Sequence, residues 1–330
     1  MTAPPPAAPI VVMGAGSIGC FVGGRLQAAG AEVHFVGRPR VLDALRAHGL
    51  RVTDQDAGDL RLAPAALRLH TEPPAGAGLV LLCVKSAATA DAARQLPRGS
   101  LVLSLQNGIS NPATATAAAP GLTVLPGMVP FNVAELAPGH VHRGTPGRIA
   151  AQDHPALHPW LPAFAAAGLP LALHADLRAV QWGKLLLNLN NPVNALSGLP
   201  LRKQLLDRDH RRVLAALQDE ALAALHAAGI APARMTPLPP RWLPTVLRLP
   251  NALFTRVAAR MLRIDAHARS SMADDLALGR RTEVDALCGE VVRLARANGT
   301  DAPLNERIAQ LVETDARPRS GAALRALLGV

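Results

Sequence analysis

Aromatic side chains are scarce in this chain of 330 residues, which has no tyrosine, five phenylalanines and three tryptophans. Proteins that hold single strands of nucleic acid stack the bases on aromatic rings, so this scarcity argues against that class. The formal net charge is +10, but the basic residues are spread along the whole sequence rather than gathered in one block. We therefore expect no nucleic-acid partner, and we expect the positive charge to suit small anionic ligands.

Cysteine and long apolar runs are also limited. Cys20, Cys83 and Cys288 are far apart, and their spacing fits neither a metal site nor a disulfide framework. Glycine, proline, arginine or asparagine interrupts the apolar runs before the roughly 18 to 20 residues that a membrane helix needs. Residues 1–6 lack a basic segment and are expected to form a short disordered leader rather than a signal peptide. These features predict a cytoplasmic protein without a membrane partner.

Lysine is rare beside arginine. Of the 34 lysines and arginines, only Lys85, Lys184 and Lys203 are lysines. An amine can shift its pKa and release a proton at neutral pH, whereas a guanidinium cannot. A lysine in this chain therefore indicates a position where positive charge alone does not suffice, and two of the three fall within the motifs below.

The chain divides into two parts of different character. In residues 1–176, strands are expected at 10–13, 32–36, 79–84 and 101–105, helices at 17–29, 40–48 and 87–96, and shorter strands within 51–74 and 121–150. This alternation predicts a Rossmann domain, an α/β fold with an open, mostly parallel sheet. Residues 177–330 are rich in alanine, leucine and arginine at helical spacing, which predicts an all-α second domain.

A glycine-rich turn separates the first expected strand from the first helix. Its six residues are Gly14, Ala15, Gly16, Ser17, Ile18 and Gly19. In dinucleotide-binding domains the first glycine permits the tight turn, the second lets the pyrophosphate approach the backbone, and the third allows close packing of helix and strand. The N-terminus of the helix then presents N–H groups to the phosphates. All six residues are therefore candidates for cofactor binding.

The end of the second strand indicates which dinucleotide is bound. NAD sites usually carry Asp or Glu there, which binds the ribose 2′-hydroxyl. This chain has Arg38 and Arg40 instead, and an arginine can pair with a 2′-phosphate. The sequence predicts NADPH, held by Arg38 with Arg40 as a second candidate. The alternative is a solvated arginine on a loop.

Lys85 and Asn107 each follow a buried strand at its carboxyl end, where ligands bind in open α/β sheets. We expect both residues to border the nicotinamide and the substrate. The alternatives are a surface lysine and an ordinary turn at Asn107-Gly108, and the matching positions of the two residues favour a functional role.

The segment 181–192 places polar residues within a leucine-rich helix. Lys184, Asn188 and Asn191 are spaced i, i+4 and i+7, so they share one helical face. Buried amides and ammonium groups are costly when they lack partners. This face is therefore expected to line a cleft and to bind substrate there; a structural network is the alternative.

Glu283 lies just before an expected helix near the C-terminal end of the chain. Thr282 is expected as the N-cap of that helix, with Asp285 three residues later in a capping-box-like start. Because a carboxylate near a helix N-terminus can have a purely electrostatic role, the residues alone leave the role of Glu283 open.

Five motifs together resemble the ketopantoate reductase (2-dehydropantoate 2-reductase) family and cover nearly the whole chain. They are GAGSIG at 14–19, VKS at 84–86, QNG at 106–108, WGKLLLN at 182–188 and SSMADDLALGRRTEVD at 270–285. The resemblance implies a Rossmann domain followed by a helical domain of the 6-phosphogluconate-dehydrogenase type. It also implies NADPH as hydride donor and a small anionic 2-oxo acid, ketopantoate, as substrate in pantothenate synthesis.

By the same resemblance, Lys184 corresponds to the catalytic lysine that protonates the carbonyl oxygen. Glu283 corresponds to the acidic residue that helps to position the substrate and that lysine. An ammonium group stabilises the negative charge that develops on a ketone oxygen during reduction and can supply the proton. The positions that correspond to cofactor- or substrate-binding residues are Lys85, Asn107, Asn188 and Ser271.

Two positions depart from the best-known members of that family. Pro192 stands where those members have another asparagine, and the segment at 267–269 replaces a substrate-binding asparagine. Reduction of a different 2-oxo acid therefore stays open as an alternative. So does a non-catalytic NADPH-binding sensor, against which Lys184 and Glu283 argue. The sequence leaves a monomer and a homodimer equally open.

Overall fold

The computed structural model describes residues 8–55, 58–259, 262 and 268–330. The chain divides into two compact units, Met1–Leu177 and Arg178–Val330, and each is described by itself. The predicted leader at residues 1–6 lies outside the described residues.

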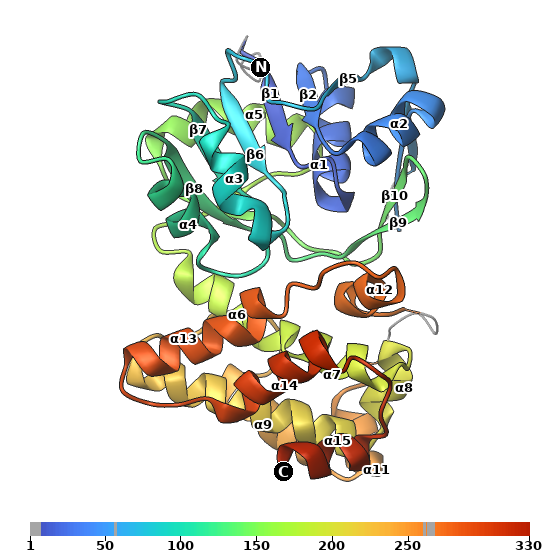
Figure 1. Ribbon diagram of the computed structural model, residues 1–330, viewed down its shortest axis with the longest axis vertical. Coiled ribbons are helices and arrows are strands. Elements are labelled where there is room, and N and C mark those ends of the chain that lie inside the picture. The colour runs from blue at the N-terminus through green and yellow to red at the C-terminus, as the bar shows by residue number, and fades with distance from the viewer. Residues whose placement is uncertain (1–7, 56–57, 260–261, 263–267) are drawn as a thin grey trace. The chain divides into compact units, whose positions relative to one another are not determined.

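The first unit is built on an eight-stranded sheet with the strand order β12-β11-β8-β7-β6-β1-β2-β5 (Figure 1). The strands are β1 (Ile10–Met13), β2 (Val33–Val36), β5 (Arg68–His70), β6 (Leu79–Leu82), β7 (Leu101–Ser104), β8 (Thr123–Met128), β11 (Ala150–Gln152) and β12 (Ala172–His174). Among the described strands of this sheet, every neighbouring pair is parallel except β8 with β11. The prediction of a mostly parallel sheet is therefore confirmed.

A second, smaller sheet has the order β4-β3-β10-β9. Its strands are β3 (Leu50–Asp54), β4 (Asp59–Leu62), β9 (Val133–Ala137) and β10 (His140–Arg143). The helices of this unit are α1 (Ser17–Ala28), α2 (Pro39–His48), η1 (Pro64–Ala66), η2 (Ser86–Ala88), α3 (Thr89–Arg94), α4 (Asn111–Ala118), η3 (Pro155–Trp160) and α5 (Leu161–Ala166).

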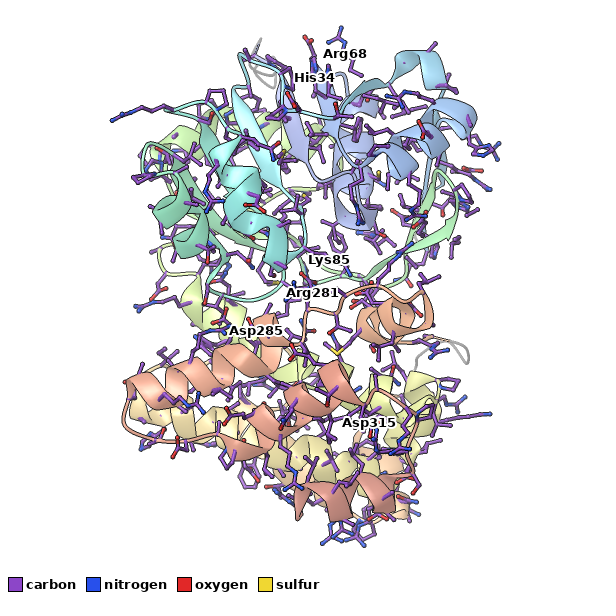
Figure 2. The ribbon with its side chains drawn as sticks, in the orientation of Figure 1. His34, Arg68, Lys85, Arg281, Asp285 and Asp315 are labelled. Carbon is purple, nitrogen blue, oxygen red and sulfur yellow. The ribbon has the colours of Figure 1, made fainter. Side chains whose placement is uncertain are left out.

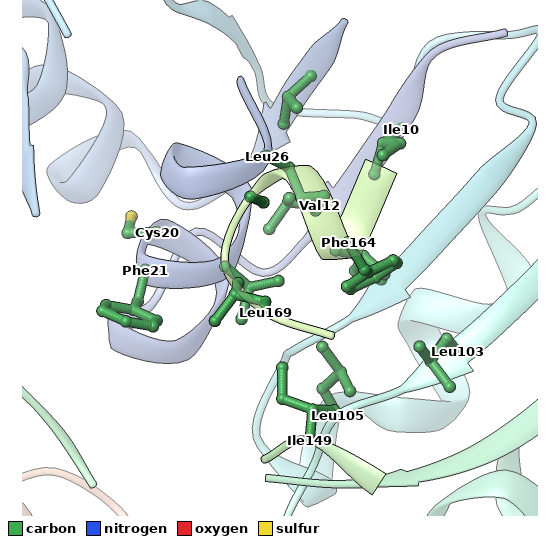
Figure 3. Close-up of a cluster of buried hydrophobic side chains, with 14 of the residues drawn as sticks. Ile10, Val12, Cys20, Phe21, Leu26, Leu103, Leu105, Ile149, Phe164 and Leu169 are labelled. Atoms are coloured by element: carbon green, nitrogen blue, oxygen red, sulfur yellow. The ribbon is translucent and has the colours of Figure 1, made fainter. Parts of the chain in front are cut away.

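Both faces of the large sheet are buried at its centre, as the alternating side chains of β1 demonstrate. Ile10 and Val12 belong to one apolar cluster, which also contains Phe21 and Phe164 (Figure 3). Their neighbours Val11 and Met13 point into a second cluster on the opposite face. This explains why β1 is a continuous apolar run rather than an alternating one. The strand order reverses at β1, where parallel α/β sheets bind their ligands.

The described residues of the second unit form helices joined by loops, without a strand among them. Its helices are α6 (Arg178–Asn188), α7 (Asn190–Ser197), α8 (Leu201–Leu206), α9 (Arg208–Ala227), η4 (Pro240–Trp242), α10 (Leu243–Arg248), α11 (Asn251–Val257), α12 (Ser271–Ala277), η5 (Asp285–Gly289), α13 (Glu290–Ala297), α14 (Pro303–Thr314) and α15 (Gly321–Leu328). The long helix α9 packs against α7, α8, α10, α13, α14 and α15. Within the described part of the chain, no helix is both long enough and apolar enough to cross a membrane.

Candidate active site

The glycines of the turn between β1 and α1 differ in their steric surroundings. Gly14 has a φ of +113°, a conformation that L side chains rarely adopt. A side chain there would meet the backbone of Val84 at 2.6 Å, and one at Gly19 would meet Val12 at 2.7 Å. At Gly16, by contrast, an added Cβ would meet nothing within 4 Å. The open space at Gly16 and the N-terminus of α1 beside it fit a dinucleotide phosphate.

Arg38 lies where β2 ends and α2 begins. Its backbone is extended, and its carbonyl accepts the N–H groups of Val41 and Leu42, so Arg38 occupies the N-cap position of α2. Arg38 and Arg40 are both exposed. Arginines therefore follow the carboxyl end of β2, where NAD sites carry a carboxylate. Their guanidinium groups fit a 2′-phosphate.

Lys85 and Asn107 follow the adjacent parallel strands β6 and β7. Figure 2 labels Lys85 within the first unit. Lys85 is exposed, and its carbonyl accepts the N–H of Ala88 at 2.8 Å in the short turn η2. The hydroxyl of Ser86 donates to the carbonyl of Asn107 at 3.3 Å, which joins the two loops. Both candidate residues therefore lie at one edge of the sheet.

Two polar residues that no sequence motif marks lie behind this edge. The Thr89 hydroxyl donates to Oδ1 of Asn111 at 3.0 Å, and Nδ2 of Asn111 donates to the carbonyl of Asn107 at 2.5 Å. Thr89 follows Lys85 by four positions, and Asn111 follows Asn107 by four positions. That shared spacing is the signal that could have identified them.

Lys184 and Asn188 lie on the partly exposed face of α6. The remaining buried residues of α6 are Val180, Gln181, Trp182, Gly183, Leu185 and Leu186. The helix ends at Asn188, because Pro192 has no N–H to donate to the Asn188 carbonyl four residues before it. Asn191, also half-buried, therefore belongs to α7. The prediction that one continuous helix carries all three polar residues is wrong at this break.

Lys184 has the most strongly perturbed ammonium group of the second unit. Desolvation lowers the pKa of Lys184 to about 8, and the charge of Glu283 opposes that shift. An amine with a pKa near 8 is mostly protonated at pH 7, yet it gives up its proton more readily than an ordinary lysine does. Such an amine is matched to general acid catalysis.

Glu283 is half-buried and lies two residues before η5. The prediction that Thr282 is the N-cap of this helix is wrong, because Val284 occupies the N-cap position. Asp285 is the first helical residue, and its carboxylate pairs with Arg293 at 2.8 Å. Val284 is fully buried. Its carbonyl accepts the helical N–H groups of Leu287 at 3.1 Å and Cys288 at 2.8 Å.

Ser271 is the exposed first residue of α12, and Ser270 before it is the N-cap. The Ser270 hydroxyl accepts the N–H of Ala273 at 3.2 Å and donates to the carbonyl of Asn191 at 3.3 Å. The N–H of Ser270 donates to Oδ1 of Asn194 at 2.9 Å. The start of α12 is therefore fastened to α7 beside Asn191.

The segment that departs from the family pattern is described in part. His267 lies outside the described residues. The carbonyl of Ala268 accepts the N–H of Leu201 at 2.8 Å, and Arg269 is exposed.

The candidate residues fall into two groups, one in each unit. In the first unit, the glycine turn approaches Val84, next to Lys85, and Lys85 is joined through its loop to Asn107. In the second unit, Glu283 acts electrostatically on Lys184, while hydrogen bonds bring the start of α12 to α7. The residues of this second group are Lys184, Asn188, Asn191, Ser271 and Glu283.

Comparison with known proteins matches both parts of the chain to one family. The sequence model described as "Ketopantoate reductase PanE/ApbA" matches residues 10–156, and its C-terminal counterpart matches residues 176–315. The chain is 33% identical over 313 residues to a 2-dehydropantoate 2-reductase of Halobacterium salinarum, covering 92% of this chain and 97% of the relative. It is 27% identical over 316 residues to one of Archaeoglobus fulgidus, covering 92% and 96%.

Solved structures give the same assignment. A PanE/ApbA family ketopantoate reductase from Ralstonia eutropha JMP134 superposes with a TM-score of 0.77 and 32% identity, covering 92% of this chain and 97% of that one. The ternary structure of D-mandelate dehydrogenase with NADH and anilino(oxo)acetate has a TM-score of 0.75 but 18% identity, over 97% and 99% of the chains, and shares the fold alone. The chain therefore belongs to the ketopantoate reductase (PanE/ApbA) family and is an oxidoreductase that acts on CH–OH groups.

Proposed function

We propose that this protein reduces 2-dehydropantoate to pantoate with NADPH, a step of pantothenate and coenzyme A synthesis. One observation supports this most directly: the ammonium of Lys184, in a chain of this family, has a pKa of about 8 beside the carboxylate of Glu283. A general acid works best when its pKa lies near the working pH. The curated relatives named above carry the name of this activity.

We assign NADPH binding to the first unit, predicted as residues 1–176. The residues Gly14 to Gly19 would receive the pyrophosphate at the N-terminus of α1, and Arg38 would pair with the 2′-phosphate. Lys85 and Asn107 would border the nicotinamide end, because they follow the strands beside β1. The nicotinamide, when bound, supplies the hydride and thus both electrons of the reduction.

We assign substrate binding and proton transfer to the second unit, predicted as residues 177–330. Lys184 stabilises the charge that develops on the ketone oxygen and delivers the proton, so that the carbonyl becomes a hydroxyl. Glu283 keeps Lys184 protonated by opposing its desolvation. Asn188, Asn191 and Ser271 offer polar groups that orient a small anionic 2-oxo acid, and Lys85 and Asn107 are the candidate substrate contacts of the first unit.

The direct test is NADPH oxidation by the purified protein with 2-dehydropantoate, beside a panel of other 2-oxo acids and with NADH in place of NADPH. The proposal expects turnover of 2-dehydropantoate well above the panel and a preference for NADPH. Turnover of another acid alone would favour the alternative substrate. Pro192 and the segment at 267–269, which depart from the best-known family members, are the reason for that alternative. Tight NADPH binding without any turnover would favour a sensor.

Lys184→Ala tests the proton donor. Loss of a general acid lowers kcat by about 10²-fold or more, while NADPH affinity should be unchanged. Lys203→Ala is the matched control, because Lys203 is an exposed lysine on α8 of the same unit. Near-normal kcat in the Lys184 variant would remove this residue from the mechanism.

A further inference from the structure

Four buried polar side chains form a continuous chain of hydrogen bonds beside the carboxyl ends of β6 and β7. Ser104 Oγ donates to Oε1 of Gln106 at 3.0 Å, and Nε2 of Gln106 donates to the Thr89 hydroxyl at 2.7 Å. Thr89 donates in turn to Oδ1 of Asn111 at 3.0 Å. Nδ2 of Asn111 then donates to the carbonyl of Asn107 at 2.5 Å. Every donor therefore points the same way along the chain, from β7 to Asn107.

This chain of hydrogen bonds contacts the protein backbone at two positions next to candidate site residues. The second N–H of the Gln106 amide donates to the carbonyl of Val84 at 2.9 Å, directly before Lys85. At the other end, the carbonyl of Asn107 receives two donors, Asn111 Nδ2 and the hydroxyl of Ser86. The loop that carries Lys85 and the loop that carries Asn107 are thus fastened to one network.

Because the side chains of the network are buried, their polar groups depend on protein partners for hydrogen bonds. The exposed fraction is 0% for Thr89, 3% for Ser104, 6% for Asn111 and 7% for Gln106, so solvent has little access to replace a lost partner. Hydrogen bonds that run in one direction polarise each other, and a fully paired buried network fixes one geometry. The network therefore ties the backbone carbonyls of Val84 and Asn107 to one set of buried side chains.

We propose that Thr89, Gln106 and Asn111 are positioning residues that set the backbone of Lys85 and Asn107 for cofactor binding and reduction. This inference rests on the proposed function for the roles of Lys85 and Asn107, and it adds the group of residues that holds them. Reactive geometry is sensitive to small displacements, since a shift of about 1 Å can cost a hundredfold in rate.

The test replaces Thr89 by valine, which keeps the shape of the side chain and removes the hydroxyl in the middle of the chain. The expected result is a loss of about tenfold or more in kcat/KM for 2-dehydropantoate and weaker NADPH binding. Thr89→Ser keeps the hydroxyl and should restore both. Thr116→Val is the matched control, because the Thr116 hydroxyl donates to the carbonyl of Pro112 on the exposed side of α4.

Hydrogen exchange of residues 84–89 and 105–111 provides a readout that does not depend on turnover. Thr89→Val should raise exchange in both segments and leave that of the α9 region unchanged. If exchange rises while kcat/KM and NADPH affinity stay at the wild-type level, or if exchange does not change, the positioning role is wrong. If Thr89→Val does not fold, Ser104→Ala removes the first donor alone and is measured in the same way.

The same experiment separates this inference from the proposed function. If the wild-type protein reduces none of the 2-oxo acids, the proposed function fails. Raised exchange together with weaker NADPH binding in Thr89→Val would then still support the positioning of Lys85 and Asn107 for the cofactor. Unchanged NADPH affinity would overturn it.

Discussion

Oδ1 of Asn194 accepts the backbone N–H of Ser270 at 2.9 Å across 76 positions of sequence. The other end of the same amide, Nδ2, donates to the carbonyl of Leu199 at 2.9 Å. Asn194 is fully buried, so both ends of its side chain depend on these protein partners. One amide thus fixes the start of α12, which carries Ser271, against α7.

Asn194→Ala should destabilise the protein by about 1 to 3 kcal/mol, because it leaves the buried N–H of Ser270 without its acceptor. The free energy of unfolding in urea measures this loss. Asn298→Ala is the control, since Asn298 is exposed and its amide donates to a carbonyl of its own helix. Equal stability of the two variants would show that the Asn194 contact contributes little.

The pH dependence of reduction should follow the lowered pKa of Lys184, which is about 8. Only the protonated amine can donate, so kcat/KM should be near its maximum below pH 8 and fall about tenfold for each pH unit above it. A profile of kcat/KM from pH 6 to pH 10.5 measures the break. A rate that persists to the ordinary lysine pKa of 10.5 would contradict the desolvation of Lys184.

Glu283→Gln should move that break to lower pH. The carboxylate of Glu283 raises the pKa of Lys184 against desolvation, so its removal lets the pKa fall further below 8. The variant should lose activity at neutral pH and regain part of it in more acidic buffer. Glu306→Gln, an exposed carboxylate paired with Arg296 in the same unit, should leave the profile unchanged.

Arg38→Ala should weaken NADPH binding about 10- to 100-fold, because hydrogen bonds to a charged phosphate contribute about 1.5 to 3 kcal/mol. The affinity for NADH, which lacks the 2′-phosphate, should change little. Equilibrium titration with both nucleotides measures the difference. Arg46→Ala on α2, whose exposed guanidinium pairs with Asp43, is the matched control. Equal losses of affinity for both nucleotides would mean that Arg38 does not bind the 2′-phosphate.

A buried arginine secures the helices around α9. The guanidinium of Arg211 is fully buried and donates to the carbonyls of Leu205, Leu247 and Leu249 at 2.8 to 3.0 Å. It also lies 4.1 Å from the ring centroid of Phe254. Arg211 therefore satisfies carbonyls near the C-terminal ends of α8 and α10, which have no partner within their own helices.

Arg211→Met should cost about 3 kcal/mol or more of stability, since it leaves three carbonyls unpaired in the interior. Arg208→Met on the same helix removes an exposed guanidinium that contacts the carbonyl of Arg248, and it should change stability by less than about 0.5 kcal/mol. Thermal or urea unfolding of both variants tests the contrast, and similar stabilities would rule out the predicted role of Arg211.

Local sequence patterns predicted much of the fold. The apolar run of β1 followed by glycines predicted the first strand, the turn and the start of α1. A continuous apolar run indicates a buried strand, and glycine permits the positive φ of the turn, so both features can be read from consecutive residues. The change to helical spacing in the second part likewise predicted an all-helical unit. The exact start of a helix was less predictable: Thr282 is a good N-cap by residue type, but Val284, two residues later, occupies the N-cap position and its carbonyl accepts helical hydrogen bonds.

The sequence by itself therefore determined the alternating strands and helices of residues 10–105, the helical character of the second part, the glycine turn and the candidate chemistry of Lys184. The tertiary structure alone decided the pKa of Lys184, which depends on desolvation by its surroundings and on Glu283, 99 positions away. It also decided the partners of Thr89 and Asn194. Desolvation and hydrogen bonding between distant segments arise only when the chain packs, so no local pattern can encode them.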